Sequence, residues 1–278
     1  MKKMLPVDFI KEVGIAKWII RTFIRQFYKR ILKKDNKIKL VNGLTINLPR
    51  NSHFGSEVFV TNCNVDWNSE YFFLENYEKG GCFLDIGAHI GYYTLLLAKK
   101  AEIIYAFEPD PRNYNPLENN IKNFSNILFV KKAISSEEGK FSFSLGSSSA
   151  NSSLISDKNT LQNIEVEVTT IDSIRKSINT KIHGIKTDIQ GMDLEALQGG
   201  KETILQDKPL IISEIQYSKE VDVFLESVNY TAFSFLRNKD SRKILFSKIP
   251  FPKNYNSKML ILIHKEDKRL EKWESFIK

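Results

Sequence analysis

Residues 83–91 read FLDIGAHIG, a short apolar strand that runs into a turn with two glycines and then into the helical pattern of residues 90–100. Gly87 allows a tight turn because it has no Cβ, and Gly91 allows the helix or a ligand to approach the strand closely. A turn of this kind is typical of a nucleotide site. The spacing of its glycines differs from the G-x-G-x-x-G pattern that holds a pyrophosphate, so NAD is not predicted.

Two acidic residues at the ends of neighbouring strands indicate the ligand. Asp85 would repel phosphates but suits the ammonium and sulfonium groups of S-adenosylmethionine. Glu108 ends the next strand, roughly 20 residues after Gly87, the spacing at which such folds bind ribose hydroxyls. The alternative is structural, with Asp85 capping the helix and the glycines only shaping the turn. The two acids in this order favour an S-adenosylmethionine site.

The chain after Cys82 alternates short apolar strands with helical segments, which predicts an α/β fold with a mostly parallel sheet. Seven strands are expected, and the last ones lie at 182–187, 210–214, 231–236 and 258–264. Residues 82–278 would then form the cofactor-binding domain. Residues 37–81 are predicted to form a hairpin, at 37–40 and 44–48, and a lead-in that packs on this domain. An insertion pairs 140–144 with 165–169 around a Ser- and Asn-rich loop.

Charge is concentrated at the N-terminus. The net charge is +8, but residues 1–34 hold ten Lys and Arg against Asp8 and Glu12, and the rest of the chain has 31 basic and 31 acidic residues. The body therefore carries no excess of positive charge for nucleic acid, and no such partner is predicted. Cys63 and Cys82 lack metal-ligand spacing, so a reducing, cytoplasmic setting and no metal site are expected.

Residues 1–36 are predicted to form a basic amphipathic helical extension. Basic residues interrupt every uncharged run of about 18 residues, so neither a transmembrane span nor a signal peptide is predicted. Two interpretations stay open. The helix could lie on an anionic membrane surface, or its apolar face could pack on the protein's own body or on a second subunit, which we favour. That face contains Ile10, Val13, Trp18, Ile20, Phe23, Ile24, Phe27 and Ile31.

Several segments in order resemble the FkbM-type methyltransferases: LDIGAHIGYYTLLLAKK, AFEPDPRNYNPLENNIKNF, VKKAISSEEGKFSFS, VTTIDSI, IKTDIQGMDLEALQGG and PLIISEI. The resemblance covers residues 65–215. It implies a class I, Rossmann-like methyltransferase fold, S-adenosylmethionine as cofactor and O-methylation of a hydroxyl on a sugar, glycan or natural product. It places the cofactor contacts on Asp85, Gly87, Ala88, His89, Gly91, Glu108, Pro109, Lys132 and Ala133.

The segment from Ile185 to Asp193 resembles the family signature K-x-D-V-E-G-x-E, which implies that Lys186, Asp188 and Asp193 belong to the catalytic site. Gln190 stands where the family has Glu, and an amide cannot accept a proton as a carboxylate does. Asp188 is therefore the predicted base for the acceptor hydroxyl. An equally weighted alternative is that Asp188 only binds the methionine end of the cofactor. Asp85, Glu108, Asp188 and Glu214 are expected to line one crevice at the carboxyl edge of the sheet.

Gln190 also motivates a different class of function. A relative that kept the fold as a catalytically inactive binding or scaffold protein, with membrane contact through its N-terminal helix, would not need a full set of acids. The presence of Asp85, both glycines and Glu108 argues against it, because a scaffold has no physical need for a complete cofactor crevice. Cofactor binding without turnover would be its signature.

Overall fold

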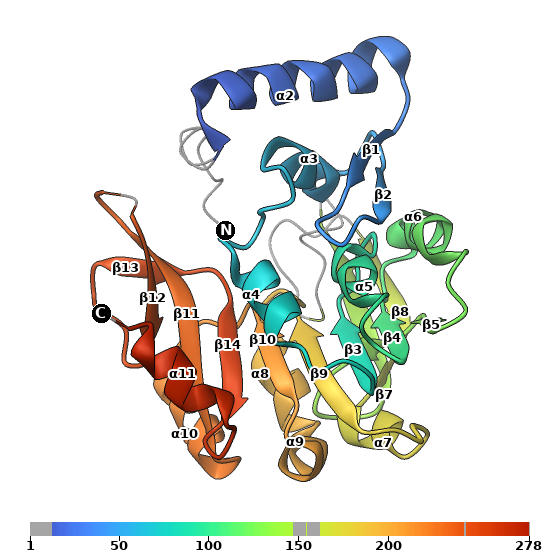
Figure 1. Cartoon of the computed structure of the whole chain (residues 1–278). Helices are drawn as coiled ribbons and strands as arrows, with labels where there is room; N and C mark the ends of the chain where they lie inside the picture. The colour runs from blue at the N-terminus through green and yellow to red at the C-terminus, as the bar shows by residue number, and fades with distance from the viewer. Residues whose placement is uncertain (1–12, 147–153, 155–161, 242, 278) are drawn as a thin grey trace.

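The computed structural model describes residues 13–146, 154, 162–241 and 243–277. Its centre is a mixed sheet with strand order β12-β11-β14-β10-β9-β3-β4-β5, and β13 pairs with β11 (Figure 1). The strands are β3 (Cys82–Ile86), β4 (Ile103–Phe107), β5 (Ile127–Val130), β9 (Ile182–Thr187), β10 (Leu210–Ser213), β11 (Tyr230–Asn238), β12 (Ile244–Lys248), β13 (Tyr255–Ser257) and β14 (Leu260–His264).

The five strands β5, β4, β3, β9 and β10 are parallel, whereas β14 is antiparallel to both β10 and β11. The predicted mostly parallel α/β sheet of the class I methyltransferase fold is therefore confirmed. The predicted number of seven strands is too low for this sheet, which has nine within the described residues. The two missed strands are β12 and β13, which are short and extend β11 at the edge of the sheet.

Helices cover both faces of the sheet because neighbouring residues of its buried strands point to opposite sides. Phe83 packs with residues of α4, α5, α6 and α11, whereas Leu84 and Ile86 pack with residues of α7 to α10. The helices are α4 (Ser69–Asn76), α5 (Tyr92–Leu97), α6 (Pro111–Ile121), α7 (Ile171–Arg175), α8 (Asp193–Gln198), α9 (Lys201–Asp207), α10 (Lys219–Ser227) and α11 (Arg269–Ser275).

Two smaller sheets flank the core. The predicted hairpin is present as β1 (Asn36–Lys39) and β2 (Thr45–Leu48), and its Ile46 and Leu48 join the same core cluster as α5. The predicted insertion is also present, as β7 (Gly139–Leu145) antiparallel to β8 (Gln162–Thr169), which pairs in turn with β6 (Ala133–Ile134). Most of the Ser- and Asn-rich loop lies outside the described residues.

The N-terminal helix α2 (Ile15–Phe27) continues into a π-helical turn (Tyr28–Leu32) and lies across α3 (His53–Val60) and the hairpin (Figure 1). The predicted amphipathic helix is thus confirmed over these residues, whereas Ile10 lies outside the described ones. The interpretation that its apolar face packs on the protein's own body is wrong: Phe23 is 70% exposed and Ile31 is 68% exposed. No helix among the described residues is long and apolar enough to cross a bilayer.

Candidate cofactor and active site

A cavity opens at the carboxyl ends of β3, β4 and β9, where the crevice of an open α/β sheet is expected. The space between its walls is about 910 Å³ including the opening to solvent, which is the size range of small-molecule sites. Segments far apart in the chain form its walls. Most of the predicted cofactor residues line it, namely Gly87, Ala88, His89, Glu108, Pro109, Lys132, Ala133 and Asp188.

The turn after β3 is held in place by the neighbouring strand β4. The amides of Gly87 and Ala88 both donate to the carbonyl oxygen of Phe107, at 3.0 and 2.8 Å. Gly87 has φ +78°, and a Cβ at this position would come within 2.2 Å of the carbonyl oxygen of Asp188. Only glycine fits here, which explains the first glycine of the turn. Gly91 does not line the cavity but begins α5, close to Leu117.

Glu108 lies at the end of β4 with its carboxyl group in the cavity wall. One oxygen accepts from the amide of His89 at 2.7 Å, and the other accepts from the amide of Asp110 at 2.9 Å. These bonds fix the carboxyl group while each oxygen keeps a second lone pair for a ligand hydroxyl. Burial raises the pKa of Glu108 to about 7, although these two amides and the Asn113 side chain act in the opposite direction.

The position of Glu108 fits the ribose of S-adenosylmethionine. Further along the cavity the wall becomes apolar, with Ala133, Ile134, Phe143 and Leu154, which suits the faces of an adenine ring. Lys132 also lines this part, and its ammonium group pairs with Glu167 on β8 at 2.9 Å. The residues present therefore fit the cofactor: a carboxylate for the ribose hydroxyls, an apolar slot beside it and a glycine turn without side-chain bulk.

We expect Glu108→Gln to weaken S-adenosylmethionine binding about 10- to 100-fold near pH 8, because charge-assisted hydrogen bonds are lost. The wild-type affinity is also expected to fall as the pH drops below about 7, by up to about tenfold per pH unit. The sign follows because the free carboxyl group binds a proton there and the ribose hydroxyls need the carboxylate. Calorimetry between about pH 5.5 and 8.5 measures both effects.

Glu118→Gln is the matched control for this prediction, because Glu118 is half-exposed on α6 and pairs only with Lys131 at the surface. Its affinity and pH profile should equal those of the wild type. A wild-type affinity that is flat across this range, or a Glu108→Gln variant with the wild-type slope, contradicts the role assigned to Glu108.

Asp85 lies beneath the cavity rather than in its wall. Its side chain is fully buried, and its Oδ2 accepts from the hydroxyl of Thr94 on α5 at 2.5 Å, while Oδ1 lies 3.4 Å from Nζ of Lys186. The expectation that Asp85 lines the crevice is therefore wrong. The physical reason is the alternation along β3, which points Asp85 to the same side as Phe83, toward α5.

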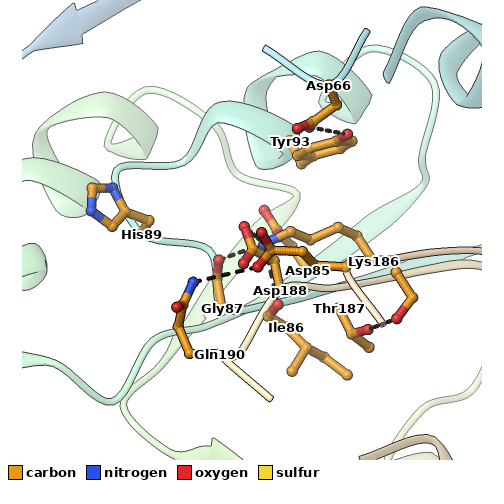
Figure 2. Close-up of polar contacts among 12 residues, drawn as sticks. Asp66, Asp85, Ile86, Gly87, His89, Tyr93, Lys186, Thr187, Asp188 and Gln190 are labelled. Carbon is orange, nitrogen blue, oxygen red and sulfur yellow. Dashed lines mark hydrogen bonds and ion pairs between the residues drawn. The ribbon is translucent and has the colours of Figure 1, made fainter. Parts of the chain in front are cut away.

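Lys186 connects Asp85 to the floor of the site (Figure 2). Its ammonium group donates to the carbonyl oxygens of Gly87, at 2.6 Å, and Ile86, at 3.2 Å, and lies 3.9 Å from Oδ2 of Asp188. Burial acts against the charge, but Asp85 and Asp188 raise the pKa of Lys186 above its ordinary value. This cation thus holds the glycine turn and stands between two carboxylates.

Asp188 is the acid of this cluster that reaches the cavity, and 37% of its side chain is exposed. Burial opposes its ionisation, but Lys186 and a hydrogen bond with Glu214 lower its pKa below the ordinary range. Burial and the nearby Asp188 raise the pKa of Glu214 instead, so the two carboxyl groups share one proton that resides on Glu214. Asp188 is the charged member of the pair.

Two of the predicted acids line a neighbouring pocket. Asp193 and Glu214 face the space beside α10, together with Gly191 and Ser218, and not the cofactor cavity. The expectation of four acids in one crevice therefore holds for Glu108 and Asp188 and is wrong for Asp85 and Glu214. Gln190 lines both pockets, and its amide donates to Glu214 at 3.4 Å.

Residues before β3 form the opposite wall of the cavity and were not predicted from the sequence. Phe54 on α3 contacts the His89 ring edge to face at 5.1 Å between centroids. Asp66 accepts from the hydroxyl of Tyr93 at 2.7 Å (Figure 2), and Nζ of Lys258 lies 3.4 Å from its other oxygen. No local pattern announces this wall, because its members are almost 200 residues apart.

Comparison with known proteins agrees with this site. The family model described as "Methyltransferase FkbM domain" matches residues 85–260, more than half of the chain. The chain is 28% identical over 144 residues to the hexuronic acid methyltransferase AglP of Haloferax volcanii; the match covers 51% of this chain and 59% of that relative. The chain thus spans only about three-fifths of the length of this relative.

Two solved structures show the same general fold. The methyltransferase FkbM from Methylobacillus flagellatus KT is 19% identical with a TM-score of 0.47, and the match covers 70% of this chain and 48% of that one. TrmK of M. capricolum, solved with S-adenosyl-homocysteine, is 15% identical with a TM-score of 0.38, over 71% and 68% of the two chains. The family match confirms the predicted class and cofactor: this chain belongs to the FkbM methyltransferase family and is an S-adenosylmethionine-dependent methyltransferase.

Proposed function

We propose that the protein methylates a hydroxyl group of a sugar or glycan and that Asp188 is the base that accepts the hydroxyl proton. The observation that carries this proposal is the placement of Asp188, an ionised carboxylate in the cavity wall next to the glycine turn. When bound, S-adenosylmethionine supplies a methyl group that is already activated by the sulfonium charge. The remaining tasks of the protein are alignment and proton acceptance.

The residues around the cavity divide these tasks. Glu108 and the apolar slot beside Ala133 would bind the nucleoside part of the cofactor. Lys186 holds the glycine turn and keeps Asp188 ionised, so it is a positioning residue. Asp66 and Tyr93 present polar atoms at the opposite wall, where they are available to the hydroxyls of a sugar.

The class of acceptor is supported by the relative from Haloferax volcanii, whose name states a hexuronic acid as its substrate. We propose a hexuronic acid or a glycan that contains one as the first acceptor to test. A uronic acid offers two kinds of oxygen for methylation, its ring hydroxyls and its carboxylate. The proposal commits to a hydroxyl, because a base at Asp188 is needed for a hydroxyl and not for a carboxylate that is already ionised.

The test incubates the protein with methyl-labelled S-adenosylmethionine and a panel of hexuronic acids, hexoses and oligosaccharides. We expect labelled product that survives mild alkali, because a methyl ether is stable there and a methyl ester is hydrolysed. Alkali-labile label would replace the hydroxyl with the carboxylate as the acceptor. Saturable cofactor binding without label in any sugar contradicts the proposed acceptor class and favours the inactive binding protein that Gln190 suggests.

A further inference from the structure

Helix α2 is mounted with its charged side toward the protein. Arg25 is buried, and its guanidinium donates to the side chain of Asn36 at 2.8 Å and to the carbonyl oxygens of Leu48 and Pro49, at 3.1 and 2.6 Å. Arg21 donates to the carbonyl oxygen of Phe59 at 2.6 Å. These bonds attach the helix to α3 and the hairpin through two cations rather than through an apolar face.

The outward side of the helix is consequently apolar, the reverse of what a helix on a water-exposed surface shows. Phe23 and Phe27 lie side by side on it, with ring centroids 6.5 Å apart. The exposed large apolar side chains of this surface, which we call the outward face, are Ile15, Ile19, Ile20, Phe23, Ile24, Phe27, Ile31 and Leu32. A contiguous apolar surface of this kind marks an interaction site.

The charges around the outward face indicate what covers it. Residues 13–34 contain seven Lys and Arg and no acidic residue. Of these, Lys17, Arg30, Lys33 and Lys34 are exposed beside the apolar side chains. A second copy of the chain packed on this face would bring like charges together, whereas an anionic lipid surface neutralises them. Exposed aromatic and aliphatic side chains with basic neighbours are the composition of a helix that lies in a membrane interface.

We propose that the outward face of α2 docks the protein onto an anionic membrane surface. The apolar side chains enter the boundary between headgroups and acyl chains, and the exposed basic residues bind lipid phosphates. Figure 1 shows α2 on the side of the sheet toward which the parallel strands point, so the docked membrane lies on the cavity side of the molecule. The proposal is independent of the acceptor, because docking needs no turnover.

The experiment is flotation of the full-length protein with vesicles of phosphatidylcholine, with or without about 30% phosphatidylglycerol. We expect binding to the anionic vesicles that weakens as salt is added. Phe23→Ser/Phe27→Ser should weaken this binding on the order of tenfold or more, and Lys17→Glu/Arg30→Glu should remove its preference for anionic lipid. Val223→Ser is the matched control, because Val223 is 59% exposed on α10, away from α2.

Light scattering after gel filtration, without lipid, separates the two partners. We expect a monomer, and the same unfolding transition and S-adenosylmethionine affinity for the wild type and for Phe23→Ser/Phe27→Ser. A dimer that this double substitution converts to monomer would show that a second copy covers the outward face. That result, an absence of anionic vesicle binding, or vesicle binding unchanged by the double substitution overturns the proposal.

Discussion

Asp188→Asn is expected to lower kcat about 10²- to 10⁴-fold, the range for removal of a general base, while the affinity for S-adenosylmethionine changes less than about threefold. Asparagine keeps the size of the side chain but cannot accept the proton. Asp188 is the ionised acid near the cavity mouth, and its neighbour Glu214 holds the shared proton. Single-turnover methyl transfer and calorimetry of the same preparation measure the two effects separately.

Asp240→Asn provides the matched control, since Asp240 is exposed in a surface turn and bonds to Asn254. It should behave as the wild type in both assays. The contrary result for Asp188→Asn is a weaker cofactor affinity with an unchanged kcat at saturation, which would make Asp188 a ligand of the methionine end of the cofactor instead of the base.

Asp85→Ala is expected to lower the free energy of unfolding by about 3–5 kcal/mol, because it leaves the buried Lys186 ammonium without its nearest carboxylate. Lys186 is 4% exposed in its side chain, and its other acidic neighbour, Asp188, is 3.9 Å away. Cofactor affinity should fall as well, since Lys186 holds the carbonyl oxygen of Gly87. Urea unfolding followed by circular dichroism gives the stability.

A double substitution tests whether the loss comes from the uncompensated charge. Asp85→Ala/Lys186→Met removes both members of the pair, so the double variant should be much more stable than the sum of the single losses implies. Strictly additive losses would mean that Asp85 and Lys186 are not coupled. The stability of Asp85→Ala would then depend on the bond to Thr94 alone.

The cofactor half of the site could be predicted because its signals are local. The turn at Gly87 and the acid at Glu108 each follow an apolar strand, and the parallel strand order brings those strand ends together. The direction of Asp85 was predicted incorrectly, because the local pattern does not show that Lys186, on another strand, takes up its charge. The wall formed by Asp66 and Lys258 has no local signal at all.

The same limit applies to the N-terminal helix. Its periodicity predicts an apolar face and a basic face but not which of them meets the protein. Arg21 and Arg25 decide this, and their partners are mostly backbone carbonyl oxygens of residues 48–59, which no sequence pattern identifies. Strands β12 and β13 were missed for a related reason, since they are short and are defined by pairing with β11.

Calorimetric titration of the wild-type protein and Glu108→Gln with S-adenosylmethionine, with NAD as a control ligand, tests the central claim most directly. We predict saturable binding of one S-adenosylmethionine per chain, binding weakened about 10- to 100-fold in the variant, and no binding of NAD. Equal affinities of the two proteins for S-adenosylmethionine, or binding of NAD to the wild type, would contradict the assignment of this cavity as the cofactor site.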